Sequence, residues 1–380
     1  NLTSAQVAVL NSAQVAAIET TDISQLNTTN VRALSTTSLT GLNTAQVAAL
    51  TSTQVGALTS TQAGALNTAQ AAAIETTDVG QLSTAAVRAL STAAVNALGT
   101  DQVQALTTAQ VAALGTNQVQ GLTTAQVAAL ESTDLAVLNS AQAAALNTAQ
   151  AAAIETTDIG QLSTAAVRAL STAAVNALGT DQVAALTTAQ VVALSTTQVQ
   201  GMTTAQVAAL ESTDLAAMTS AQVAVLNSAQ AAAIETTDIS QLNTTNVRAL
   251  STTALSGLNT EQVAALTSTQ VAALTSTQAG ALNTAQAAAI ETTDIGQLST
   301  ATVRALSTAA VNALGTDQIQ ALATSQVAAL TTAQVQGLTT AQVAALESTD
   351  LAVLNSAQAA VLNTAQAAAI ETTDIGQLST

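Results

Sequence analysis

The feature that most constrains the fold of this chain is an eight-residue register that never slips. From Leu2 to Leu378, every eighth residue is Leu, Ile or Met, which gives 48 consecutive matches without an insertion or a deletion. A representative octad is Leu-Thr-Thr-Ala-Gln-Val-Ala-Ala at residues 122–129, and we number its positions 1 to 8. Short repeats that cannot bury their apolar residues alone form solenoids, in which each unit packs on its neighbours.

The residue order within an octad predicts one short helix followed by a corner. Position 1 is a large aliphatic residue and position 6 is Val, Ala, Ile or Leu, with Ala and Gln, which favour helix, between them. Thr123 is placed to cap the helix and Gln126 to reach back to it in a capping box. Position 3 is always Ser or Thr, and we expect its hydroxyl to donate to a backbone carbonyl at the corner or in the next coil. One isolated turn of helix is unstable in water, so the octads must stack.

A longer pattern predicts how many octads form one coil. Octads that begin Ile-Glu-Thr-Thr-Asp start at residues 18, 74, 154, 234, 290 and 370, with spacings of 56, 80, 80, 56 and 80 residues. The long and short spacings differ by 24 residues, or three octads. Loss of one three-sided coil would leave every other octad on its face, whereas loss of three octads would shift a four-sided stack out of register. We therefore predict an all-α solenoid with three octapeptide helices per 24-residue coil, a triangular prism in which residues 24 apart lie above one another.

The alternative fold is a three-sided β-solenoid, because Thr and Val favour strands. The enrichment in Ala and Gln and the lack of period-two alternation count against it. In either case we expect residues 1–380 to form a single continuous array, as a window of a longer one. A 216-residue superunit covers residues 2–217 and starts again at residue 218.

The composition excludes most chemistry. The chain has no His, Cys, Lys, Trp, Tyr or Phe, so it lacks an ordinary general base near neutral pH, an activated thiol and an amine for a Schiff base. We expect no enzyme activity, no small-molecule substrate and no cofactor other than a candidate Ca²⁺. A net charge of −17 repels nucleic acids, and the polar residues of each octad interrupt every apolar run before it could span a membrane.

Acidic residues fall into columns if octads three apart share a face. The bland interpretation is that these acids stabilise helix N-termini, and the sharper one is that they hold Ca²⁺ between coils together with hydroxyl or backbone oxygens. The candidate Ca²⁺ columns comprise Glu131, Asp134, Glu155, Asp158, Asp181, Glu211, Asp214, Glu235, Asp238, Glu261, Glu347, Asp350, Glu371 and Asp374. Each of the five Arg residues lies one octad after an acidic octad, so we expect partial charge compensation at a corner rather than a binding site.

The tandem Leu-Thr-Thr-Ala-Gln-Val-Ala-Ala units resemble octapeptide arrays in very large, adhesin-like surface or secreted proteins of Gram-negative bacteria. This resemblance covers the whole chain and implies an extracellular or cell-surface location and a spacer, stalk or filament role. The sequence alone predicts a structural protein: a rigid acidic rod that serves as a stalk or associates with itself, end to end or laterally, into fibres. The alternative is surface recognition, in which regular Thr rows bind ice or a glycan.

Overall fold

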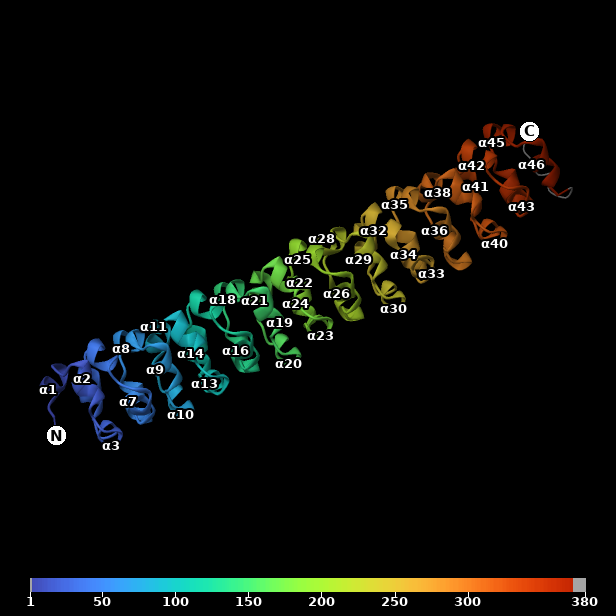
Figure 1. The fold of residues 1–380 in the computed structure, drawn as a ribbon. Coiled ribbons are helices and arrows are strands. Elements are labelled where there is room, and N and C mark those ends of the chain that lie inside the picture. Colours follow the sequence, from blue (N-terminus) through green and yellow to red (C-terminus); the bar gives the residue numbers. More distant parts are fainter. Residues whose placement is uncertain (1, 372–380) are drawn as a thin grey trace. The chain divides into compact units, whose positions relative to one another are not determined.

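The computed structural model describes residues 2–371, and these residues form short α-helices without a strand (Figure 1). The helical prediction is therefore confirmed, and the β-solenoid alternative is wrong, because the capping and helix-forming residues of each octad outweigh the strand preference of Thr and Val. Contacts divide the chain into two units, Asn1–Leu194 and Ser195–Thr380. The first unit contains helices α1 (Ser4–Ala8) to α24 (Thr188–Ala193), and the second contains α25 (Thr196–Gly201) to α46 (Thr364–Ala369).

Every helix begins at position 3 of an octad and ends at position 6, 7 or 8. Examples of the three lengths are α3 (Thr20–Ile23), α16 (Thr124–Ala128) and α14 (Thr108–Ala113). None of the described helices is long and apolar enough to cross a membrane. The corner is the extended residue at position 2 together with the Leu, Ile or Met before it.

The predicted capping box is present at the start of α16. The Thr123 Oγ1 accepts a hydrogen bond from the Gln126 backbone N–H at 3.1 Å, while the Gln126 Oε1 accepts one from the Thr123 N–H at 2.8 Å. The same reciprocal pair recurs in most octads that have Gln at position 5, for example between Asn147 and Gln150. These bonds satisfy N–H groups that a helix N-terminus otherwise leaves without partners.

The start of α41 (Thr324–Ala329) lacks half of this arrangement, because exposed Ala323 occupies the capping position. We expect Ala323→Thr to raise the free energy of unfolding by about 1 kcal/mol, since a capping hydroxyl contributes about that much relative to Ala. Urea unfolding followed by circular dichroism at 222 nm measures the change. Thr331→Ala, at the same position of the next octad, is the matched control and should lower stability by a similar amount, because the Thr331 hydroxyl does cap its helix. Equal stability of all three proteins would contradict this account of the corner.

Within each unit, every helix packs against the helix three places along the chain. In the first unit α14 contacts both α11 (Thr84–Ala89) and α17 (Ser132–Ala136), and in the second α41 contacts α38 (Thr300–Ala305) and α44 (Ser348–Ala352). Three consecutive octads therefore separate one layer from the next, and we call such a set of 24 residues a coil.

The core of each unit is made by positions 1 and 6. Leu122 and Val127 are almost completely buried, and so are the residues that correspond to them along nearly the whole array. Several position-6 residues are Ala rather than Val, such as Ala143 and Ala151, and these are fully buried as well.

Gln at position 5 joins one coil to the coil before it. The Gln126 Nε2 donates to the Val95 carbonyl at 2.9 Å and to the Leu98 carbonyl at 2.7 Å, which lie 31 and 28 residues earlier. Gln150 makes the equivalent bonds to Val119 and Leu122. A single amide thus completes the capping box of its own helix through Oε1 and donates to the preceding coil through Nε2. We call the bonds from Nε2 to the preceding coil the inter-coil bonds.

Candidate functional site: the acidic edge

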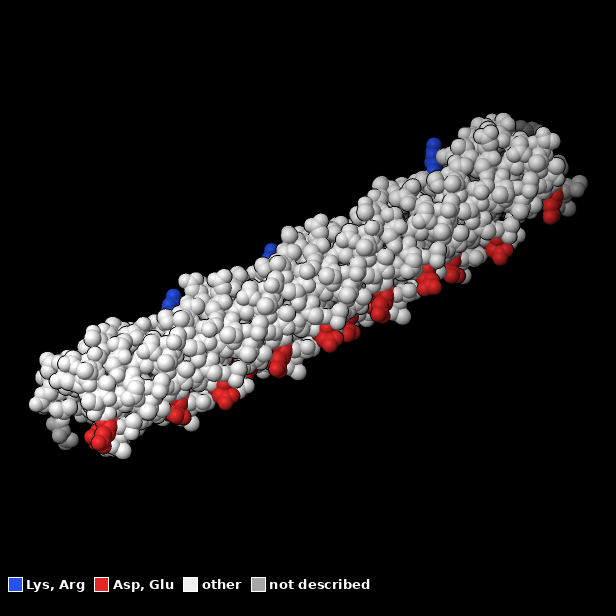
Figure 2. Space-filling view, in the orientation of Figure 1, with Lys and Arg blue, Asp and Glu red and all other residues white. Residues whose placement is uncertain are grey.

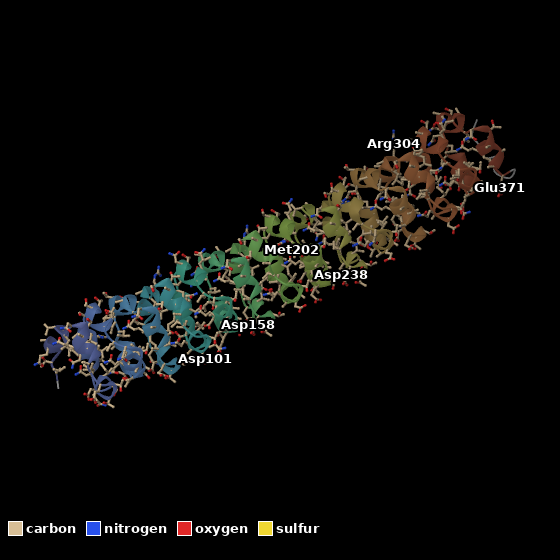
Figure 3. The ribbon with its side chains drawn as sticks, viewed as in Figure 1. Asp101, Asp158, Met202, Asp238, Arg304 and Glu371 are labelled. Carbon is tan, nitrogen blue, oxygen red and sulfur yellow. The ribbon has the colours of Figure 1, made fainter. Side chains whose placement is uncertain are left out.

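The acidic side chains of each unit gather along one edge, which we call the acidic edge (Figure 2). Figure 3 locates Asp101 and Asp158 on this edge of the first unit and Asp238 on that of the second. On the described helices these acids stand at N-termini: Glu occupies the capping position of helices such as α17, without a side-chain capping bond, and Asp lies in the first turn. These positions agree with the first interpretation, because a negative charge at a helix N-terminus typically stabilises a helix by ~0.3 to 1 kcal/mol. The stabilisation itself stays a prediction.

The structure separates the candidate Ca²⁺ residues into three groups by burial. The Glu side chains and Asp181 are exposed: Glu131, Glu155, Glu211, Glu235, Glu261, Glu347 and Glu371. Asp158 and Asp238 are half-buried, and Asp134, Asp214 and Asp350 are buried. Asp374 lies outside the described residues.

The stacking of these acids follows the predicted columns, because α17 contacts α20 (Thr156–Ile159), which contacts α23 (Thr180–Ala184). Within one octad, however, the Glu and the Asp differ in exposure: Glu131 is exposed, whereas Asp134 is only 2% exposed. Among residues 2–371, no three acidic side chains come close enough together to hold a metal ion. Ca²⁺ binding stays a prediction that titration calorimetry after chelator treatment can test.

Burial changes the acidity of two position-5 carboxyls. Burial raises the pKa of Asp134 from 3.8 to about 6; a hydrogen bond from the Glu131 backbone opposes this shift, and the nearby Glu131 charge adds to it. Burial also raises the pKa of Asp350, against hydrogen bonds from the Thr324 side chain and the Glu347 backbone. Both groups lie too deep to touch a substrate, so their proton exchange concerns the packing of the coils.

Hydroxyls at position 3 reach two kinds of acceptor in the following coil. The Ser140 Oγ donates to the Ala165 carbonyl at 3.3 Å, as the sequence predicted. Ser52 and Ser268 instead donate to the carboxylates of Asp78 and Asp294, 26 residues later. Most other position-3 hydroxyls, such as that of Thr124, are exposed.

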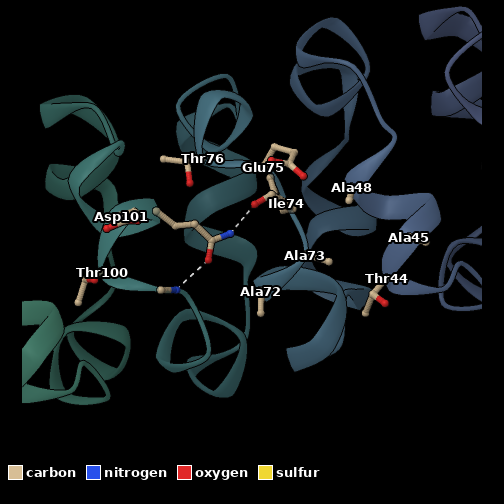
Figure 4. Close-up of a pocket in the computed structure, with 12 residues that line it drawn as sticks. Thr44, Ala45, Ala48, Ala72, Ala73, Ile74, Glu75, Thr76, Thr100 and Asp101 are labelled. Atoms are coloured by element: carbon tan, nitrogen blue, oxygen red, sulfur yellow. Dashed lines mark hydrogen bonds between the residues drawn. The ribbon is translucent and has the colours of Figure 1, made fainter.

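A shallow groove recurs along the acidic edge where a Glu octad is followed one coil later by an octad that begins Leu-Gly-Thr-Asp, which we call the Gly-Thr-Asp octad. In the first copy, Glu75 and Asp101 line the groove together with Thr76 and Thr100 (Figure 4). The copies in the rest of the array are lined by Glu155 with Asp181 and by Glu291 with Asp317.

The floor of the first groove is held by Gln102, the position-5 residue of the Gly-Thr-Asp octad. Its amide accepts from the Gly99 N–H at 2.8 Å and donates to the Ile74 carbonyl at 2.6 Å, as drawn in Figure 4. The groove therefore presents two carboxylates and two hydroxyls at the surface of the stack.

Two of the five Arg residues, Arg32 and Arg248, bind carbonyls at helix ends, and charge compensation by the Arg residues stays a prediction. Figure 3 shows Arg304 on the side of the second unit opposite Asp238. The Nε atoms of Arg32 and Arg248 donate at 3.2 Å to the carbonyls of Ala57 and Ala273, at the C-terminal end of the helix one coil later. A cation near helix C-terminal carbonyls is favourable, so these two side chains have a helix-end role.

Sequence reasoning missed the inter-coil bonds of Gln, although a signal for them was present. A capping box accepts Glu as readily as Gln at its fourth residue. Position 5 is never Glu in this chain, although Asp, Asn, Ser, Thr and Ala all occur there. Exclusion of Glu indicates that the long side chain must also donate a hydrogen bond.

Comparison with known families finds similarity to one repeat family. The family model described as ALTTAQ repeat matches eleven stretches that together cover most of the chain: residues 15–52, 39–68, 71–108, 104–132, 151–188, 184–212, 207–244, 231–268, 287–324, 319–346 and 343–380. The comparison with curated proteins finds no match.

Proposed function

This chain belongs to the ALTTAQ repeat family, and we propose that it is a structural protein, a stiff acidic rod used as a stalk or as a building block of fibres. The observation that carries the proposal is the set of inter-coil bonds. Bonds such as those from Gln126 and Gln150 tie each coil to the one before it through buried groups that are shielded from water. A stack tied together at most of its corners resists bending, because bending would stretch or break bonds inside the core.

The finer geometry that we propose is a triangular prism with one octad helix on each side. Support comes from the helix contacts, which within each unit always join helices three apart. If coils stack at ~8 to 10 Å, the usual distance between packed helices, the chain is roughly 125 to 160 Å long. Small-angle X-ray scattering measures this length, and a compact particle with a maximum dimension well below 100 Å would contradict the rod.

A stalk and a fibre subunit differ in self-association. We propose that the partner of this chain is another copy of itself, bound end to end or through the sides of the rod. Electron microscopy of the purified protein separates the two roles: discrete short rods support the stalk, and long uniform fibres support the polymer. Repetition at 0.5 M NaCl tests whether repulsion between acidic edges limits lateral contact, because salt screens exposed charges.

We propose an extracellular or cell-surface location, which the resemblance to adhesin-like arrays implies. Antibody labelling of intact and permeabilised cells that carry the native protein tests it. Labelling only after permeabilisation would contradict a surface location and leave the rod itself untouched.

A second candidate function, recognition of ice or a glycan surface, is favoured by one observation. The position-3 hydroxyls of Thr116, Ser140 and Thr164 are exposed on α15 (Thr116–Gln120), α18 (Ser140–Ala145) and α21 (Thr164–Ala169), which contact one another in turn. They form a row of hydroxyls one coil apart. Measurement of thermal hysteresis and of binding to a glycan panel tests this function, and inactivity in both assays would eliminate it.

A further inference from the structure

The polar residues at position 5 share one inter-coil hydrogen bond, and Asp is the exception. Beyond the first coil, each of the residue types Gln, Asn, Ser and Thr at this position donates to the carbonyl of the residue 28 places earlier. Gln126 donates to Leu98 at 2.7 Å, Asn246 to Met218 at 2.8 Å and Thr302 to Leu274 at 3.2 Å. An ionised Asp has no hydrogen to donate, so it is the one polar residue at this position that cannot make this bond.

Asn and Asp have the same length, so the exception is chemical and not geometric. The Nδ2 atoms of Asn30 and Asn246 reach their carbonyls at 2.9 and 2.8 Å. A protonated Asp carries an O–H at a similar distance from its backbone and can make the same bond.

Two of the position-5 acids, Asp134 and Asp350, are almost completely buried. They are 2% and 3% exposed, and the carbonyls 28 places earlier belong to Leu106 and Leu322. We propose that Asp134 and Asp350 are acid-activated cross-links: when each takes up a proton from solvent, its carboxyl donates to that carbonyl and ties two coils together.

The charged surroundings of Asp134 all favour proton uptake. Its neighbours in the stack are α14, which has no titratable residue, and α20, which brings Asp158 and the capping Glu155. The exposed Glu131 lies at the start of its own helix. These groups are all acidic, so no cation opposes the uptake.

Asp350 has similar charged neighbours in the second unit and one further contact. It packs against α41, which has no titratable residue but whose Thr324 side chain hydrogen-bonds to the Asp350 carboxyl. Glu347 stands at the N-terminal capping position of its own helix and makes no side-chain capping bond. Glu371 stands in the capping position of the octad that follows one coil later, and the Asp374 of that octad lies outside the described residues.

The sign of the pH effect follows from the raised pKa of Asp134, about 6 when folded against 3.8 as the reference. Between these values the folded protein holds more protons than the unfolded one, so stability rises as pH falls through about 6 and levels off below 3.8. From pH 7.5 to pH 5, this shift corresponds to a roughly tenfold decrease in local opening of the coils around α17.

Hydrogen exchange with mass spectrometry on the full chain tests the proposal. After correction for intrinsic exchange rates, peptides from α14 and α17 should be about tenfold more protected at pH 5 than at pH 7.5 in the wild type. Asp134→Asn should remove this difference and give high protection at both pH values, because Asn donates permanently. Asp350→Asn should do the same for α41 and α44, independently.

The controls separate the proposal from a general effect of charge. Asp181→Asn removes an exposed acid from the same edge and should leave the pH response of α14 and α17 unchanged. Asp134→Gln, the commonest residue at this position, is a second variant if Asn packs poorly. A pH response that persists in both Asp134 variants, or its absence from the wild type, would overturn the proposal.

Discussion

Val191→Asp is expected to lower the free energy of unfolding by more than about 4 kcal/mol, the largest effect of any single substitution considered. Val191 stands at position 6 of its octad and is 1% exposed on the side of α24 that packs against the coil before it. A carboxylate there would be buried without a cation and without room for water. Urea unfolding followed by circular dichroism at 222 nm measures the loss.

The next residue provides the matched control. Val192 is 37% exposed, so Val192→Asp introduces the same charge one residue further along the same helix but leaves it in water. We expect this variant to change stability by less than about 0.5 kcal/mol. Similar losses in both variants would show that charge repulsion, and not burial at position 6, limits the stack.

Gln126→Glu is expected to cost about 3 kcal/mol at pH 7.5. The variant keeps the shape of the side chain and the acceptor that closes the capping box, but it replaces the Nε2 donor by an oxygen facing the carbonyls of Val95 and Leu98. The Leu98 carbonyl loses the Nε2 donor, the Val95 carbonyl keeps the bond from the Leu98 N–H, and a charge is buried beside both. This costs more than the loss of an ordinary hydrogen bond. Unfolding in urea at pH 7.5 and pH 4.5 should show that part of the loss is recovered at the lower pH.

Gln120→Glu makes the same chemical change at an exposed position of a neighbouring helix. It should leave stability almost unchanged at both pH values. If Gln126→Glu also proves harmless, the inter-coil bonds contribute little, and apolar packing alone holds the coils together.

The sequence predicted the features of this fold that depend on residues within one octad. Thr123 and Gln126 form the capping box, and the Leu and Val positions form the core, because capping and burial are read from local order and periodicity. The 24-residue coil was also predicted from the sequence, because an insertion of three octads keeps every face in register. The contacts between helices three apart agree with this prediction.

The role of Gln126 toward the preceding coil was not predicted, because it depends on where carbonyls 28 and 31 residues earlier come to lie. The burial of acids at the acidic edge was not predicted for the same reason, because it depends on how one coil packs on another. Sequence placed the acids in columns, but only the structure shows that Asp134 points into the stack while Glu131 stays in water. The two acids are only three residues apart on one turn of helix, yet one faces solvent and the other faces the stack. The octad pattern alone does not distinguish these two environments.

The inter-coil bonds have a direction, because each position-5 amide reaches back to residues already made and never forward. During translation, only about the last one and a half coils therefore contain carbonyls whose position-5 amide has not yet been synthesised. All earlier coils can complete their inter-coil bonds while the chain is still being made. Folding in this order needs no contact between segments that are far apart in the sequence. A protein many times longer could therefore fold as readily as a short one.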